Sequence, residues 1–94
     1  MADLRVQIDA LDAQVVALLA QRAAYIDRAI DLKPAEALPA RIGSRVEDVV
    51  AKVRAEAVAQ GLDPALVERM WRLMIEWSIA REEMVLGASP KEAE

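Results

Sequence analysis

An all-helical fold is predicted for this chain by a shortage of helix breakers and by apolar residues that recur at helical spacing. Of the 94 residues only 3 are glycine and 4 are proline, whereas 55% are hydrophobic and 30% are charged. This composition is typical of a globular protein built from long helices. We predict three helices per chain, one long, one short and one of medium length, in a single helical domain over residues 1–87 with a flexible tail over residues 88–94.

The first predicted helix begins near Leu4 and is unusually long. Apolar residues recur there every three or four positions, as on one face of a helix and not as on a strand: Leu4, Ile8, Leu11, Val15, Leu18, Tyr25 and Ala29. No glycine or proline interrupts the pattern before Pro34, so the helix covers about 30 residues and about 45 Å. A compact domain of this size has a radius of gyration of about 13 Å. The helix would therefore protrude from a monomer, which favours a homodimer in which a second copy covers it.

A loop is predicted where the long helix meets its first prolines. Pro34 and Pro39 lack a backbone N–H and disfavour a helical conformation in the residue before them. We therefore expect the first helix to end at Pro34 and a fairly stiff loop to extend to Gly43.

The second predicted helix is short and begins with a capping signal. Ser44 is followed three residues later by Glu47, the pattern of a capping box, so we expect a helix from about Arg45 to Gln60. Four valines lie on one face of this helix, at positions 46, 49, 50 and 53.

The third predicted helix follows a tight turn. Gly61 ends the second helix, and Asp63 with Pro64 supplies the N-cap and first-turn proline of the next, which extends to Gly87. Its predicted apolar stripe consists of Leu66, Met70, Leu73, Met74, Trp77, Met84 and Val85.

Several classes of function are excluded by composition. The chain has no cysteine and no histidine, which excludes a disulfide framework, a zinc site and a Ser-His-Asp triad, and we expect neither a metal nor a cofactor. A net charge of −4 argues against a nucleic-acid partner, whose phosphates it would repel. No apolar run approaches the roughly 18 residues that cross a membrane. Asp3, Arg5 and Asp9 replace the apolar core of a signal peptide, so we expect a cytoplasmic protein.

Arg22 is the anomaly of the first helix, because it falls where the apolar repeat predicts a hydrophobic residue. It is either an arginine at the edge of the stripe, reaching water or an acid, or an anion receptor. Lys33 follows eleven residues later, about 20° around the helix and about 16 Å along it, so the two cations share a face. Arg5 precedes Arg22 by about 25 Å of helix and cannot join them within one chain. If two first helices pack antiparallel, Arg5 would complete the site of the other copy.

Further polar candidates lie on the two later helices. Arg45 falls in the first turn of the second helix, where the helix dipole favours an acid, so it is either a binding residue or a solvated surface arginine. For Arg41 we favour the second alternative, a solvated surface arginine. Ser78 and Glu82 are spaced i,i+4 on one face of the third helix and would present two polar groups together. Alternatively, Glu82 belongs to a charged outer face with Glu76, Arg81 and Glu83, and Trp71 and Trp77 are core residues.

Taken together, these residues resemble the all-helical chorismate mutase family over about residues 3–86. The similarity is carried in the first helix by the pairs Leu4-Arg5, Ile8-Asp9, Leu11-Asp12 and Leu18-Leu19 with Arg22 and Lys33. Later in the chain it is carried by Arg45, the turn Gly61-Leu62-Asp63, and Ile75-Glu76-Trp77-Ser78.

The resemblance implies an intertwined homodimer with two shared active sites that convert chorismate, a small dianion, to prephenate in aromatic amino acid biosynthesis. It implies that Arg22, Arg45 and Arg5 of the other copy hold the substrate carboxylates, and that Ser78 contacts the substrate. It also implies that Lys33 and Glu82 face the ether oxygen, which gives Lys33, Glu82 and Arg22 the catalytic roles. The rearrangement is pericyclic, so it requires a pre-organised conformer and well-placed charges but no cofactor.

Val46 departs from the resemblance, because bacterial mutases of this kind usually carry a glutamate there that binds the ring hydroxyl. The pair Arg45-Val46, with Leu38-Pro39-Ala40 before it, also resembles isochorismate pyruvate lyase, a sister activity on the same scaffold, whereas Ser78 favours the mutase. A helical interaction module without catalysis is the third alternative.

Overall fold

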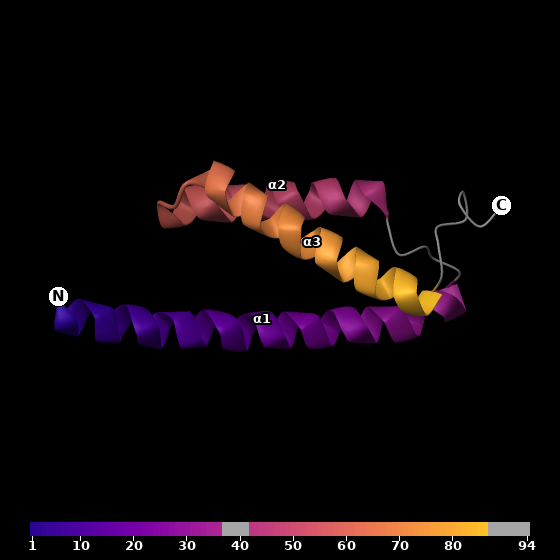
Figure 1. The fold of residues 1–94 in the computed structure, drawn as a ribbon. Coiled ribbons are helices and arrows are strands. Elements are labelled where there is room, and N and C mark those ends of the chain that lie inside the picture. The colour runs from indigo at the N-terminus through magenta and orange to yellow at the C-terminus, as the bar shows by residue number, and fades with distance from the viewer. Residues whose placement is uncertain (37–41, 87–94) are drawn as a thin grey trace.

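Three helices make up the described part of the chain, as the sequence predicts. The computed structural model describes residues 1–36 and 42–86, which form α1 (Ala2–Glu36), α2 (Gly43–Gln60) and α3 (Pro64–Leu86). In Figure 1, α2 and α3 form an antiparallel hairpin, and α3 descends obliquely toward the C-terminal part of α1. Among the described residues α3 packs against both other helices, whereas α1 and α2 do not pack against each other. No described helix combines the length and the apolar character that crossing a membrane requires.

α1 continues through Pro34, so the prediction that the helix ends there is wrong. The helix runs for 35 residues, to Glu36. A proline deprives the preceding turn of one hydrogen bond, but its own φ is fixed near about −65°, which is a helical value. The two residues after Pro34 can therefore complete the last turn. Pro39 and the predicted loop over residues 37–41 lie outside the described residues, as does the predicted tail.

The predicted capping box at the start of α2 is also wrong. The N-cap is Ile42, with φ −119° and ψ 102°, and no side chain caps the helix. The backbone N–H groups of Arg45 and Val46 donate to the Ile42 carbonyl at 3.0 and 3.1 Å, so the helix begins two residues earlier than expected. Ser44 lies inside the first turn as a result. Glu47 instead accepts two hydrogen bonds from a residue of α3, described below.

The turn between α2 and α3 confirms its prediction in detail. Gly61 adopts the left-handed conformation, with φ 74° and ψ 24°, which a residue without Cβ adopts at little cost. The N–H of Leu62 donates to the Ala57 carbonyl at 2.8 Å, closing the end of α2. The carboxylate of Asp63 accepts the N–H of Ala65 at 2.9 Å and so caps α3.

The small core lies between α2 and α3. Val50, Ile75 and Ile79 are buried together, and Val46, Val49 and Trp71 pack against them, so the predicted valine face of α2 is confirmed for three of its four valines. The apolar stripe predicted for α3 is wrong for a single chain: Leu73, Trp77 and Met84 are 74%, 57% and 88% exposed. Apolar residues occupy more than one face of α3, and those that are buried among the described residues are Val67, Ile75 and Ile79.

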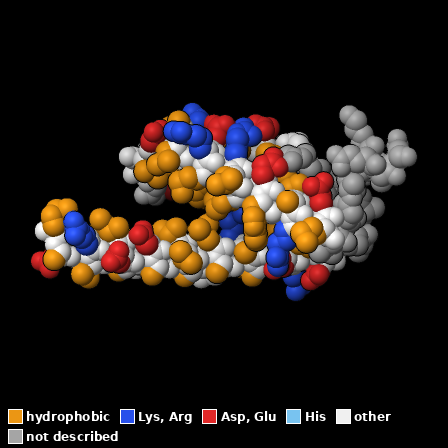
Figure 2. Space-filling model, viewed as in Figure 1, with side chains coloured by type: hydrophobic (Ala, Val, Ile, Leu, Met, Phe, Trp, Pro, Cys, Tyr) orange, Lys and Arg blue, Asp and Glu red, His pale blue; other side chains and the backbone are white. Residues whose placement is uncertain are grey.

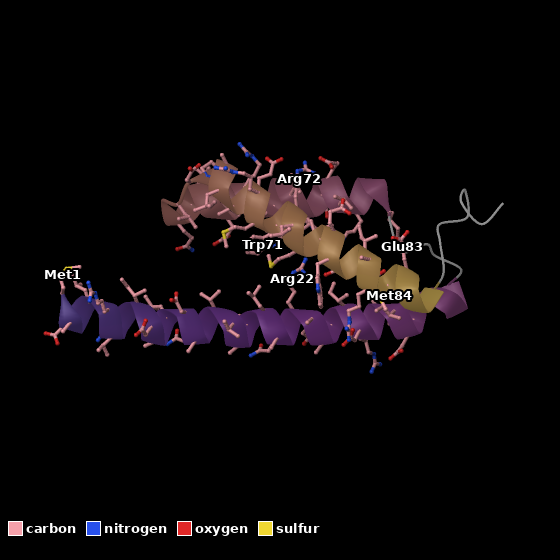
Figure 3. All side chains as sticks on the ribbon, in the orientation of Figure 1. Met1, Arg22, Trp71, Arg72, Glu83 and Met84 are labelled. Atoms are coloured by element: carbon pink, nitrogen blue, oxygen red, sulfur yellow. The ribbon has the colours of Figure 1, made fainter. Side chains whose placement is uncertain are left out.

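Ion pairs join α2 to α3 on their outer side. Glu68 accepts hydrogen bonds from Arg54 and Arg72, both at 2.7 Å, and Arg72 reaches both carboxylate oxygens of Glu47 at 3.0 and 3.2 Å. In Figure 3, Arg72 lies on the side of the hairpin away from α1. These contacts fix the register of the two helices at the surface.

The first twenty residues of α1 are little covered by the other described residues, although Val16, Leu19 and Ala20 border a groove shared with α3. Every one of them is exposed, including large apolar side chains such as Leu11 at 57% and Val16 at 64%. Figure 2 shows open space between the N-terminal end of α1 and the α2–α3 hairpin, with hydrophobic side chains along this end. The chain consequently measures 56 × 22 × 18 Å, with a radius of gyration of 16.2 Å, against about 13 Å for a compact domain of this size.

Candidate functional site

A pocket of about 390 Å³ opens where the three helices come together. Its volume lies in the range of small-molecule sites. Twelve residues line it: Arg22, Tyr25, Ile26, Ala29, Ile42, Arg45, Val46, Val49, Ile75, Ser78, Ile79 and Glu82. Several of these apolar residues also form the core between α2 and α3. The rigid packing of the hairpin therefore shapes one wall of this pocket, which we call the charged pocket.

Four of the six predicted site residues line the charged pocket. Arg22 comes from α1, Arg45 from α2, and Ser78 and Glu82 from α3. Up to 60 positions separate these residues in the sequence, so only the tertiary fold brings them together. Their gathering follows from α3 crossing both other helices.

Arg22 supplies a partly buried cation to the pocket. In Figure 3 its side chain reaches from α1 toward α3. Burial lowers the pKa of Arg22 from its usual value, and the positive charge of Arg45 lowers it further. Both effects disfavour the charged form of the guanidinium. A bound anion would offset them, and a group with two carboxylates could meet both arginines.

Arg45 stands at the edge of the pocket and is partly engaged elsewhere. Its side chain is 64% exposed and donates to Asp48 at 2.9 Å, and Lys52 pairs with the same carboxylate at 3.0 Å. The hydrogen bond from Lys52, with smaller contributions from the nearby cations, lowers the pKa of Asp48. Arg45 is thus both exposed to solvent and part of the pocket lining, so the two alternatives for this residue are not exclusive.

Ser78 and Glu82 are buried polar groups on the α3 wall. Their exposed fractions are 6% and 4%, and they lie one helical turn apart. The alternative that placed Glu82 on a charged outer face is therefore wrong. A hydroxyl and a carboxyl in this position can form directional contacts with a ligand whose charge is held by the arginines.

Tyr25 and Ile42 line the pocket without having been predicted to do so. Tyr25 is 78% exposed and lies three residues after Arg22, on the same side of α1, and this spacing could have identified it. Ile42 could not have been found, because its place depends on α2 beginning earlier than its capping pattern predicts.

Of the remaining predicted residues, only Arg5 can be placed relative to the pocket, and it is not among the described residues that line it. Arg5 lies seventeen residues before Arg22, in the exposed part of α1. Lys33 lies near the C-terminal end of α1, but its side chain is outside the described part of the structure. Arg41, whose contribution the sequence left open, is likewise outside the described residues.

The arrangement defines a class of protein, namely an all-helical protein whose pocket combines two cations with an apolar surface and so suits a compact anion. Two cations, the hydroxyls of Tyr25 and Ser78 and one carboxyl line a pocket with apolar walls, and the described residues contain no acidic cluster that could hold a metal ion.

The chain belongs to the chorismate mutase type II family, whose profile matches residues 4–83. The resemblance seen in the sequence is thus confirmed, and the match includes the four predicted site residues that line the charged pocket, Arg22, Arg45, Ser78 and Glu82. Neither a curated protein nor a solved structure matches the chain.

Proposed function

We propose that this chain is a chorismate mutase, which rearranges chorismate to prephenate in the charged pocket. The observation that carries the proposal is the convergence of Arg22, Arg45, Ser78 and Glu82 on one pocket in a chain of this family. In the reaction one ether C–O bond breaks while one C–C bond forms within the same molecule. No group is transferred to or from the enzyme, so a site without a nucleophile suffices.

The two arginines of the pocket are assigned to the two substrate carboxylates. Arg22 is partly buried and repelled by Arg45, so a dianion is the ligand that relieves both penalties. The apolar walls, which include Val49 and Ile75, would hold the ring and the side chain in the folded conformer that reacts.

Lys33 and Glu82 are assigned to the ether oxygen, on which negative charge develops as the C–O bond breaks. A cation aimed at that oxygen stabilises the transition state more than the ground state. Glu82 would contribute by donating a hydrogen bond, for which its carboxyl must hold a proton. The role of Lys33 rests on the family resemblance.

A second copy of the chain is proposed to complete the site with its Arg5. Support comes from the first twenty residues of α1, all of which are exposed in the single chain and which carry a row of apolar side chains. Leaving so much apolar surface in water is unfavourable, and an antiparallel α1 from a second copy would cover it. The same packing carries Arg5 toward the other pocket.

Product identification tests the proposal. Purified protein is incubated with chorismate and, separately, with isochorismate, and the products are separated and identified. We expect prephenate from chorismate, loss of nearly all turnover in Arg22→Ala, and little change in Arg28→Ala, an exposed arginine six residues later on the same helix. Absence of prephenate would overturn the proposal.

Isochorismate pyruvate lyase is the second candidate, and Val46 is the observation that favours it. Val46 lines the charged pocket, so α2 offers an apolar side chain where the resemblance leads one to expect a glutamate for the ring hydroxyl. Salicylate and pyruvate formed from isochorismate, with no prephenate from chorismate, would establish this activity instead.

A module that binds without catalysis would form neither product. It would also tolerate Arg22→Leu with equal or higher stability, because the change removes a charge from a partly buried position.

A further inference from the structure

Arg81 of α3 is held by two groups outside the charged pocket. Its Nε donates to Asp27 Oδ1 at 2.8 Å and its Nη2 donates to Asp27 Oδ2 at 3.2 Å, so the guanidinium meets the carboxylate with two parallel bonds. The Arg81 Cζ also lies 5.6 Å from the centre of the Trp77 ring, within the range of a cation–π contact. We call these three groups the Asp27–Arg81 clamp. Their contacts hold the Arg81 side chain in one orientation.

The clamp joins α1 to α3, the contact on which the width of the charged pocket depends. α1 packs on α3 and not on α2 within the described residues. Among the described residues, Arg22 on α1 and Arg45 on α2 are therefore placed relative to each other through α3. Any rotation or slide of α1 on α3 would move Arg22 against the rest of the pocket.

The clamp is close to the pocket residues in sequence but does not line the pocket. Arg81 lies three residues after Ser78 and one before Glu82, and Asp27 lies five residues after Arg22. Asp27 and Arg81 instead line a separate hollow with Ile30. A bond fixed at these positions therefore sets both the axial position and the rotation of α3 on α1.

We propose that Asp27 and Arg81 are positioning residues, which hold α3 against α1 so that Ser78 and Glu82 face Arg22 at the distance the reaction requires. The inference rests on the proposed function and deepens it. Both partners are about half exposed, at 47% and 48% of their side chains, and ion pairs at such places contribute little to stability. A displacement of about 1 Å in an active site, by contrast, can reduce turnover by up to about a hundredfold. Loss of the Asp27–Arg81 bond should therefore lower the turnover number more than the stability of the fold, because it changes where the site residues lie.

Steady-state kinetics of Asp27→Asn, Arg81→Gln, Arg81→Lys and the double variant Asp27→Asn/Arg81→Gln test the inference. We expect kcat to fall about tenfold in each single variant with KM nearly unchanged. The double variant should be no worse than the singles, because all of them lose the same bond. Arg81→Lys keeps the charge but lacks the planar guanidinium that binds both carboxylate oxygens. It should therefore retain only part of the wild-type kcat.

Rescue distinguishes positioning from a general contribution to folding. The exchanged pair Asp27→Arg/Arg81→Asp should recover much of the turnover that either exchange alone removes. Arg69→Gln, which removes an exposed arginine from the same helix, is the matched control and should leave kcat within about twofold. Circular dichroism and thermal unfolding check each variant, and if Arg81→Gln does not fold, Asp27→Asn and Arg81→Lys carry the comparison.

Two outcomes would overturn the inference while leaving the proposed function intact. In the first, wild-type protein forms prephenate and all the clamp variants keep its kcat and KM. In the second, only KM rises and the rise disappears at high salt. Arg81 would then act by long-range electrostatic attraction of the dianionic substrate. Wild-type protein that forms no product from chorismate or isochorismate would overturn the function and the inference with it.

Discussion

The two halves of α1 are similar in sequence and opposite in surroundings. Up to Gln21 every residue is exposed, whereas from Arg22 onward the helix carries half-buried residues and the buried Ile30. Both halves place apolar residues at helical spacing. The difference shows that a hydrophobic repeat predicts that a face will be covered, but not which chain will cover it. Here the packed half carries Arg22 and the exposed half carries Arg5, so the proposed site draws on both.

The largest effect is expected when two inactive variants are refolded together, because a mixed dimer would contain one complete site. Arg5→Ala and Arg22→Ala should each reduce kcat/KM by roughly a hundredfold or more, as truncation of one partner of a desolvated charge pair does. When equal amounts are unfolded together and refolded, half of the dimers contain one chain of each kind. One of their two sites receives both arginines, so roughly a quarter of all sites should regain activity. No recovery would mean that Arg5 and Arg22 do not meet across two chains.

A charge placed on the exposed half should separate the two copies. Leu11→Lys puts a cation at a position that is 57% exposed in the single chain and is proposed to be covered in the dimer. We expect a monomer by sedimentation equilibrium, with most of the turnover lost, because burying an unpaired charge is unfavourable. Ala55→Lys is the control, since it lies seven residues after Asp48 on the charged face of α2. A wild-type protein that is itself monomeric would contradict the dimer.

In the packed half, Glu82→Gln should keep most of the turnover, whereas Glu82→Ala should lose most of it. A glutamine amide has nearly the shape of the carboxyl and can donate a hydrogen bond to the ether oxygen, whereas alanine leaves that oxygen without this donor. The turnover number and KM are measured for both variants and for the wild type. A glutamine variant as inactive as the alanine variant would show that Glu82 does not donate to the substrate.

The smallest change in stability is expected when an ion pair between α2 and α3 is removed. Hydrogen bonds from Arg72 lower the pKa values of Glu47 and Glu68. A carboxyl whose pKa is lowered on folding stabilises the fold above its unfolded value, near about 4.3, and that stability is lost as pH falls through the lowered value. Arg72→Gln should therefore reduce the melting temperature slightly at pH 7 and hardly at pH 3. An equal loss at both pH values would point to packing by Arg72 instead of charge.

Most helix ends could be predicted because their signals are local. Gly61 and Asp63 act through their own backbone and side chain, and the structure places the turn where both indicated it. Pro34 and Ser44 misled for the same reason: a proline disturbs the residues before it more than those after it, and Ser44 could cap a helix only if the helix began there. At both positions the surrounding helix extended past the local signal.

The site could be predicted as far as resemblance reached and no further. The sequence and its family resemblance indicate four residues that the structure places at one pocket: Arg22, Arg45, Ser78 and Glu82. The bond between Asp27 and Arg81 joins residues 54 positions apart, and no spacing rule connects them. The packed face of α3 was missed for a related reason, since Leu73 and Val67 are equally apolar and only the neighbouring helices decide which of them is buried.

The two tryptophans lie in contrasting places, and this gives the protein a built-in optical reporter. The chain has 2 tryptophans, 1 tyrosine and no phenylalanine, so indole dominates its fluorescence. Trp71 packs against the core between α2 and α3, whereas Trp77 is 57% exposed and lines an apolar groove of about 590 Å³ beside α1. Water around an indole shifts its emission to longer wavelength. If a second copy covers the groove, emission from Trp77 should move to shorter wavelength as the protein is concentrated, while Trp71 stays constant. Comparing Trp71→Phe with Trp77→Phe would then follow association without any label.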